Sequence, residues 1–340
     1  MRIASTSALV AVMLTASTAA AQQIPQDRLR TAARQALVLL ENTSPTFIKT
    51  GGCNSCHNQF LPAAAQAFAK SRGVPTGTPL AQLPAEVSEA TTERYIEYSI
   101  GGGGGVPGLG FDLFASAMAG KPATDHMRAE LYFVKGMQRP EGNWARGAGD
   151  RRPPLIFDDF TPTAFMVFAL NRYAPAVDAA DTQARIARAR AWLAKTPAER
   201  TQERSFKVLG LAWSHADQKT IAAAVKDLRA LQNRNGGWSQ LPTMETDAYA
   251  TGMALYALSV AGVPAKDAAY QAGLNYLLST QAADGTWHVK TRSLPLQPYF
   301  ETGYPYDQDQ WISAAGAAYA TLAISAALDT MPGTQVASLR

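Results

Sequence analysis

The chain has 340 residues, of which 47% are hydrophobic and 17% are charged, a composition typical of a globular protein. Its formal net charge is only +4 and its basic residues are scattered, so no nucleic-acid-binding function is expected. Arg2, the apolar run 8–14 and the small residues up to Ala21 predict a signal peptide cleaved near Ala21. We therefore expect a periplasmic or secreted protein without a transmembrane segment, because no later apolar run is long enough to span a bilayer.

The first motif of the mature chain is Cys53-Asn54-Ser55-Cys56-His57, which contains both cysteines of the sequence. A Cys-x-x-Cys-His sequence is typical of c-type haem attachment, in which two thiols bond to the haem vinyl groups and the histidine ligates the iron. An exported protein can acquire this cofactor, so we predict one covalent haem c held by Cys53, Cys56 and His57. A Cys53–Cys56 disulfide is the alternative interpretation, since disulfides form in the same compartment.

Hydrophobic periodicity predicts two kinds of helix in alternation. Amphipathic helices with a charged face are expected outside, and apolar helices rich in small residues are expected to be buried. The predicted outer helices cover residues 26–41, 85–99, 123–138, 180–195, 218–232 and 266–281. The predicted inner helices cover residues 58–70, 110–120, 161–172, 203–214, 246–261 and 310–327. No segment alternates convincingly as a β-strand would, so the sequence predicts an all-α fold, a single (α/α)6 toroid.

The sequence Gln-x-x-x-Gly-x-Trp recurs after predicted outer helices, at residues 138–144, 232–238 and 281–287. Glycine suits a left-handed helix end, and the polar groups of Gln and Trp can fasten the turn to a neighbouring helix. Three copies indicate a repeat array. Over about residues 85–330 the repeats resemble those of squalene-hopene cyclases and protein prenyltransferase β-subunits. The resemblance implies an α/α toroid over these residues. The expected division of the chain is then a signal peptide (1–21), N-terminal helices with the Cys-x-x-Cys-His motif (22–84), the toroid (85–330) and a tail (331–340).

Aspartates at the starts of the inner helices are the candidate catalytic residues: Asp159, Asp247 and Asp309. Their structural interpretation is helix N-capping, which contributes about 0.5–2 kcal/mol each. The cyclase family uses Asp-x-Asp-Asp-Thr-Ala as its acid motif, and the string Phe-Asp-Asp-Phe-Thr at 157–161 does not match it. The prenyltransferase zinc site is not expected either, because no cysteine follows Cys56.

The leading hypothesis is an exported toroid with haem c at an apolar barrel cavity, in a redox or ligand-binding role. It implies an isoprenoid-like or other lipophilic ligand, a periplasmic electron-transfer partner, and His288 as a candidate distal iron ligand. The first alternative is a terpenoid cyclase or isomerase that uses Asp159 or Asp309 as a general acid without haem. The second is a non-catalytic binding module with a Cys53–Cys56 disulfide.

Overall fold

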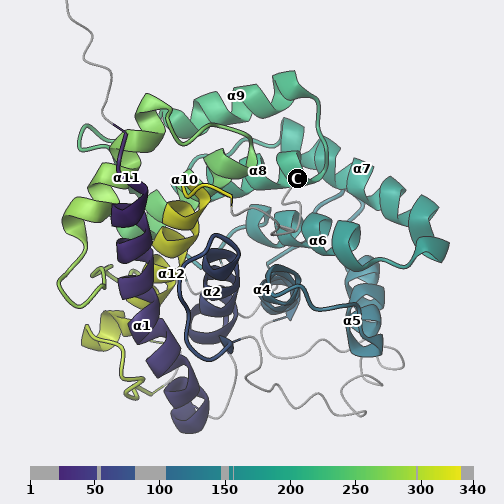
Figure 1. The fold of residues 1–340 in the computed structure, drawn as a ribbon. Coiled ribbons are helices and arrows are strands. Elements are labelled where there is room, and N and C mark those ends of the chain that lie inside the picture. Colours follow the sequence, from purple (N-terminus) through teal and green to yellow (C-terminus); the bar gives the residue numbers. More distant parts are fainter. Residues whose placement is uncertain are drawn as a thin grey trace, which may run out of the picture.

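The computed structural model describes residues 23–51, 55–80, 105–146, 153–155, 157–295 and 298–330. The predicted signal peptide, Cys53, the predicted outer helix 85–99 and the tail 331–340 lie outside these residues, so export and domain division stay predictions. The described part confirms the all-α toroid (Figure 1), and its only sheet is one antiparallel pair of two-residue strands. In this part of the chain, no helix combines the length and apolarity needed to cross a bilayer.

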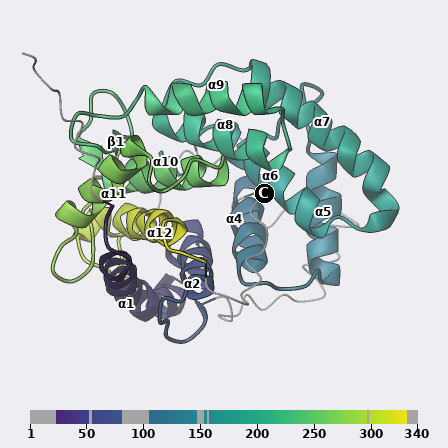
Figure 2. The same cartoon turned by 45° about the horizontal axis from the view of Figure 1, so that its top comes forward.

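The inner helices form a closed ring, which is visible in Figure 2. They are α2 (Leu61–Ser71), α4 (Gly105–Met118), α6 (Phe160–Tyr173), α8 (Thr201–Trp213), α10 (Ala248–Val260) and α12 (Gln310–Ala326). Each packs against the next in chain order, and α12 packs against α2. Small residues permit the close approach: a Cβ on Gly252 of α10 would lie 2.5 Å from the backbone nitrogen of Ala320 in α12.

The remaining long helices surround this ring: α1 (Gln26–Gly51), α5 (Asp125–Gly136), α7 (Ala179–Lys195), α9 (Gln218–Arg229) and α11 (Ala268–Thr280). Helix α1 extends beyond the predicted end at residue 41 and passes through Pro45 to Gly51. The strands β1 (Trp238–Ser239) and β2 (Thr246–Asp247) bring the end of one repeat turn to the start of α10.

The repeated turns fasten consecutive outer helices together. The Gln138 side chain donates through Nε2 to its own turn at Gly142 O (2.9 Å) and to Arg185 O of α7 (3.0 Å). Gln232 repeats this arrangement with Gly236 O and with Ala269 O of α11. The indole nitrogens complete each unit by donating to carbonyls at the ends of the preceding helices: Trp144 to Val134, Trp238 to Leu228 and Trp287 to Leu277.

The third turn closes the ring, because it joins α11 to the first helix, α1. Gln281 Nε2 donates to Gly285 O and to Ala32 O, both at 3.0 Å. Gly285 has φ +88°, and a Cβ there would lie 2.5 Å from the carbonyl carbon of Gln35. The turn and the first helix therefore meet backbone to backbone, which only glycine permits.

We expect Gly285→Ala to lower the free energy of unfolding by about 3 kcal/mol, because it combines left-handed strain with a backbone clash. Gly120→Ala is the matched control, since Gly120 has φ +71° but nothing within 4 Å of its added Cβ. The control should cost only about 1 kcal/mol. Urea unfolding followed by circular dichroism measures both, and equal losses would contradict the closing role of Gly285.

Candidate functional site

Asp158 is a buried carboxyl at the start of inner helix α6. Its Oδ1 accepts from the backbone nitrogen of Thr161 at 2.7 Å, so it caps the helix. Its Oδ2 accepts from Nε2 of Gln202, which begins the next inner helix, at 2.7 Å. Only 9% of the residue is exposed, and this burial raises the pKa of Asp158 to about 6 despite the hydrogen bonds. The desolvation of the charged form is therefore larger than the stabilisation by its donors.

Asp247 repeats this environment at the start of α10. Its Oδ1 accepts from the backbone nitrogen of Ala250 at 2.8 Å, and its Oδ2 accepts from Nε2 of Gln240 at 2.9 Å. Burial again raises the pKa to about 6, while Arg292 acts in the opposite direction. Asp247, one of the three aspartates predicted from the sequence, is therefore a buried carboxyl in an environment like that of Asp158.

The two glutamines connect these acids to further polar groups. The Tyr249 hydroxyl donates to Oε1 of Gln202 at 2.9 Å, which fixes the amide orientation and points its NH2 group toward Asp158. Arg292 Nε donates to Oε1 of Gln240 at 3.1 Å, so this amide also points its NH2 group toward an acid. The starts of α6, α8 and α10 thus meet at one end of the ring, which we call the mouth.

Asp159 and Asp309 hold the repeat turns. Asp159 accepts from Asn143 Nδ2 at 3.0 Å and from the backbone nitrogen of Arg146 at 3.1 Å. Asp309 accepts from the backbone nitrogen of Thr291 and from Nε2 of His288, both at 2.7 Å. These bonds tie the starts of α6 and α12 to the turns that precede them, a structural role close to the capping interpretation.

A cavity of about 1,240 Å³ opens beside Asp158 at the mouth. Its wall combines that carboxyl with aromatic rings contributed by separate segments: Phe133, Phe157, Phe160 and Trp192. Inside the barrel, aromatic rings pack on one another: Phe114 and Phe165 lie 5.2 Å apart and Phe168 and Trp213 lie 4.8 Å apart. Because Asp158 forms part of the wall of the mouth cavity, a ligand in that cavity can meet its carboxyl group.

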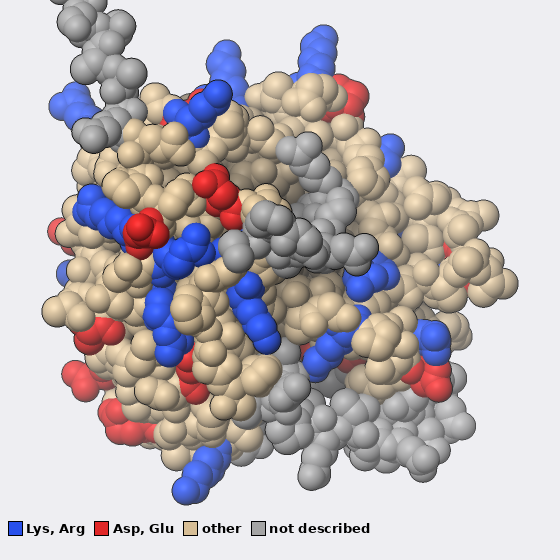
Figure 3. Space-filling model, viewed as in Figure 1, with Lys and Arg blue, Asp and Glu red and all other residues tan. Residues whose placement is uncertain are grey.

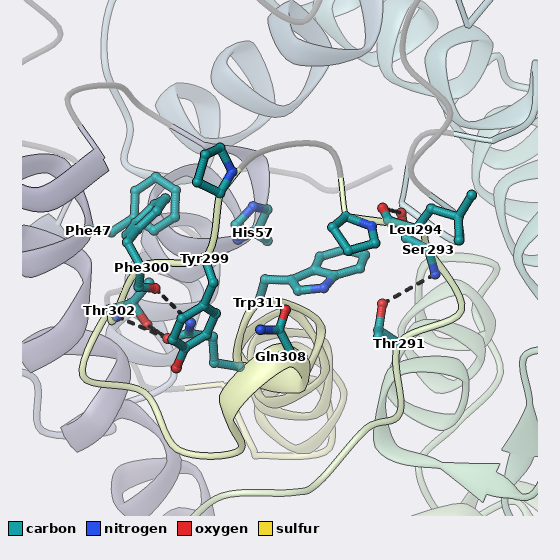
Figure 4. A pocket seen from close by; sticks show the side chains of 13 residues that line it. Phe47, His57, Thr291, Ser293, Leu294, Tyr299, Phe300, Thr302, Gln308 and Trp311 are labelled. Carbon is teal, nitrogen blue, oxygen red and sulfur yellow. Dashed lines mark hydrogen bonds between the residues drawn. The ribbon is translucent and has the colours of Figure 1, made fainter.

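A second cavity, of about 500 Å³, lies at the start of α12 (Figure 4). His57 forms part of its wall and is only 4% exposed. The ring of His57 packs edge-on against Phe47 (5.4 Å between centroids) and Trp311 (5.5 Å), and its Nδ1 is hydrogen-bonded to the side chain of Asn58. His57 and its neighbours thus form an aromatic pocket beside the segment that follows the third repeat turn.

The prediction of haem c is wrong on the described residues. No group of three or more His, Cys, Asp or Glu side chains in that part of the chain is arranged to hold a metal ion. His288, the candidate distal ligand, pairs with Asp309 and stacks on Tyr306 at 4.7 Å, with 47% of its side chain exposed. Cys56 belongs to the helical turn Cys56–Phe60 and packs against the core, and Cys53 lies outside the described residues. The electron-transfer partner inferred from the haem has no support either.

On the face seen in Figure 3, basic and acidic side chains are interspersed, with no continuous field of one sign. Several of them form ion pairs on or between outer helices, such as Arg229–Asp267 at 2.8 Å and Lys135–Asp178 at 2.9 Å.

No protein-family model and no curated protein matches the sequence, but solved structures do. A variant of the type II terpene cyclase MstE from Scytonema, in complex with geranylgeranyl dihydroxybenzoate, matches with a TM-score of 0.53 and 14% identity. The match covers 90% of this chain and 99% of that one. A glycosidase variant matches with a TM-score of 0.59 and 12% identity, over 89% and 98% of the two chains. At such identities the likeness shows the α/α-toroid fold alone.

We expect the carboxyl groups of Asp158 and Asp247 to titrate near pH 6, and that of the helix cap Asp217 below its usual value of 3.8. Asp217 is a matched comparison because it caps outer helix α9 but is exposed to solvent, and its bonds to Thr220 lower its pKa. Carboxyl-carbon NMR of the protein labelled at aspartate measures all three. Titration of Asp158 near pH 4 would contradict the buried environment.

The same pKa rise has a consequence for stability. Because the folded protein holds these two protons more tightly than the unfolded chain does, their contribution to stability is present at pH 4 and is lost as pH rises through about 6.

Proposed function

We propose that the protein is a toroid enzyme of the terpenoid cyclase or isomerase kind, in which Asp158 donates a proton to an alkene of a lipophilic, isoprenoid-like substrate. The observation that carries the proposal is a buried carboxyl with its pKa raised to about 6, placed in the wall of an aromatic cavity. An acid that protonates an alkene must hold its proton near neutral pH, and burial is one way to achieve this.

In the proposed step, the O–H bond of the Asp158 carboxyl breaks and a C–H bond forms at one alkene carbon, using the π electrons of the double bond. The resulting carbocation is attacked by the next double bond, which closes a ring. A carbon-bound proton is finally lost to solvent, and Asp158 regains a proton from water, so the reaction is a net isomerisation. Rings such as Phe157, Phe160 and Trp192 in the cavity wall can stabilise the cation through their π faces.

The neighbouring groups support Asp158 as the acid. Gln202 holds the carboxyl through one oxygen, and Tyr249 fixes the orientation of Gln202. Asp247 has a comparable pKa and is the second candidate acid, whereas Asp159 and Asp309 are engaged in holding the repeat turns. We therefore transfer the proposed catalytic role from Asp159 and Asp309 to Asp158.

One structural neighbour suggests the proposed substrate class, an isoprenoid-like molecule. The matching terpene cyclase was solved with geranylgeranyl dihydroxybenzoate, a ligand with a long prenyl chain. The cavity beside Asp158 offers an apolar, ring-lined wall to a chain of this kind.

We expect Asp158→Asn to reduce turnover by at least about 100-fold, since general acid catalysis of this type contributes 10²–10⁴-fold. The measurement is product formation in deuterium oxide from squalene, geranylgeraniol and geranylgeranyl diphosphate. Mass spectrometry of the wild-type product should show one solvent deuteron incorporated per molecule, because the first proton comes from an exchangeable carboxyl.

Asp217→Asn is the control, because it makes the same chemical change at a helix cap outside the mouth. Circular dichroism should show both variants folded. Wild-type turnover in Asp158→Asn, or wild-type product without deuterium, would contradict the proposal, and binding without any conversion would favour the non-catalytic binding module.

A further inference from the structure

Three arginines converge on a single ring at the mouth. The guanidinium carbon of Arg200 lies 4.9 Å from the centroid of Phe157, and those of Arg146 and Arg292 each lie 5.4 Å from it. They come from three separate parts of the chain: the segment after the first repeat turn, the start of α8, and the segment after the third turn. Like charges repel, so such convergence needs either nearby acids or a ligand of opposite charge.

The nearby acids do not bind two of these arginines. Arg200 pairs with Glu203 at 3.2 Å, but among the described residues Arg146 and Arg292 have no carboxylate within 4.0 Å. Arg146 donates to Phe157 O and Arg292 donates to the Gln240 side chain, both neutral acceptors. A guanidinium group has five N–H donors, so most of the donors of these two residues are left for other acceptors.

These remaining donors face accessible space. No nitrogen of Arg146 or Arg292 is among the buried side-chain atoms that lack a hydrogen-bond partner. Arg146, Arg200 and Phe157 all line the mouth cavity beside Asp158. A ligand in that cavity can therefore reach Arg146 and Arg200, and Arg292 lies next to them on the Phe157 ring that forms part of the cavity wall.

The acids of the same region already have donors of their own. Asp158 and Asp247 accept from helix backbone and from glutamine amides, and Asp159 accepts from Asn143 and from a backbone nitrogen. Glu203 accepts from the backbone nitrogens of Glu199 and Arg200 as well as from the Arg200 side chain. They lessen the local positive charge without occupying the guanidinium groups of Arg146 and Arg292.

We propose that Arg146, Arg200 and Arg292 form an oxyanion-binding site around Phe157, which holds the carboxylate or phosphate head group of an amphiphilic substrate. The planar fork of a guanidinium group matches both kinds of oxyanion with paired hydrogen bonds. Phe157 supports the three groups through cation–π contacts and keeps them apart. The apolar part of the substrate then lies along the aromatic wall of the cavity. Binding of the head group by the arginines does not depend on the proposed function. The inference rests on that function only for the reaction that Asp158 catalyses after the substrate has bound.

The test compares three ligands that share one chain: geranylgeranyl diphosphate, geranylgeranoic acid and geranylgeraniol. Calorimetry at low salt should show that the wild-type protein binds at least one anionic ligand about tenfold or more tightly than the alcohol. The preference should fall as salt is added, because it is electrostatic. Preference for the diphosphate alone identifies a phosphate head, and preference for both anions identifies a general oxyanion site.

Arg146→Gln and Arg292→Gln should each reduce this preference by about tenfold while leaving binding of the alcohol unchanged. Arg200 is left intact because it belongs to the capping box of α8. Arg234→Gln, at an exposed position of the second repeat turn, is the matched control and should bind as the wild type does. Equal binding of alcohol and anions, no binding of any ligand, or an unchanged preference in both variants would overturn the proposal.

The two proposals fail separately. Asp158→Asn should retain or strengthen the head-group preference, because binding needs no proton transfer and the change removes a negative charge from the cavity wall. A wild-type protein that incorporates deuterium but shows no preference would refute only the oxyanion site, and one that shows the preference without turnover would refute only the catalytic role of Asp158.

Discussion

The toroid depends on the glutamine of each repeat turn. One amide NH2 group donates to two carbonyls, one in its own turn and one in the next outer helix, as Gln138 does with Gly142 and Arg185. The carbonyl of Gly142 belongs to the turn itself, and that of Arg185 lies within helix α7, so the bonds fix the turn against the helix. The glutamine bonds to a backbone carbonyl of the next outer helix, so the side chains of that helix can vary freely. The same clamp, by which we mean this pair of hydrogen bonds from one glutamine amide, therefore works at each turn. At Gln281 the next helix is α1, and the chain closes on itself.

This clamp also decides where acids become buried. It sets the outer helices side by side, so the inner helices begin at the same end and their first residues face one another. Asp158 and Asp247 each lie at such a start, next to a glutamine that approaches from elsewhere. Backbone and amide donors favour the ionised form, but removal from water opposes it more strongly, and the pKa rises. Asp159 follows Asp158 directly, but its side chain is 30% exposed and faces the repeat turn. Its carboxyl group accepts from the backbone nitrogen of Arg146 and so holds the loop in place.

Most of the fold could be predicted from the sequence, and much less of the site could. Alternating periodicity and the three Gln-x-x-x-Gly-x-Trp turns identified the toroid, because both are local patterns with a direct structural meaning. Helix α1 was predicted too short, since Pro45 reads locally as the end of a helix but is tolerated here. Asp159 was favoured over Asp158 because the difference between them depends on Gln202, which lies 44 residues away in the chain. The Cys-x-x-Cys-His string misled because it is a short motif, whereas the surroundings of His57 come from α1 and α12.

The segment after the third repeat turn contacts groups of both cavities. Thr291 and Ser293 line the aromatic cavity that contains His57 (Figure 4), whereas the intervening Arg292 reaches Gln240 and Phe157 on the other side. Neighbouring residues of this segment thus reach two sides: Thr291 and Ser293 line the aromatic cavity, and Arg292 contacts Phe157, which forms part of the wall of the mouth cavity. In the proposed binding mode, selection between ligands takes place at this mouth, where Asp158 and the arginines around Phe157 lie. The residues that decide it are then those of the loops, which the toroid holds in place but does not itself specify.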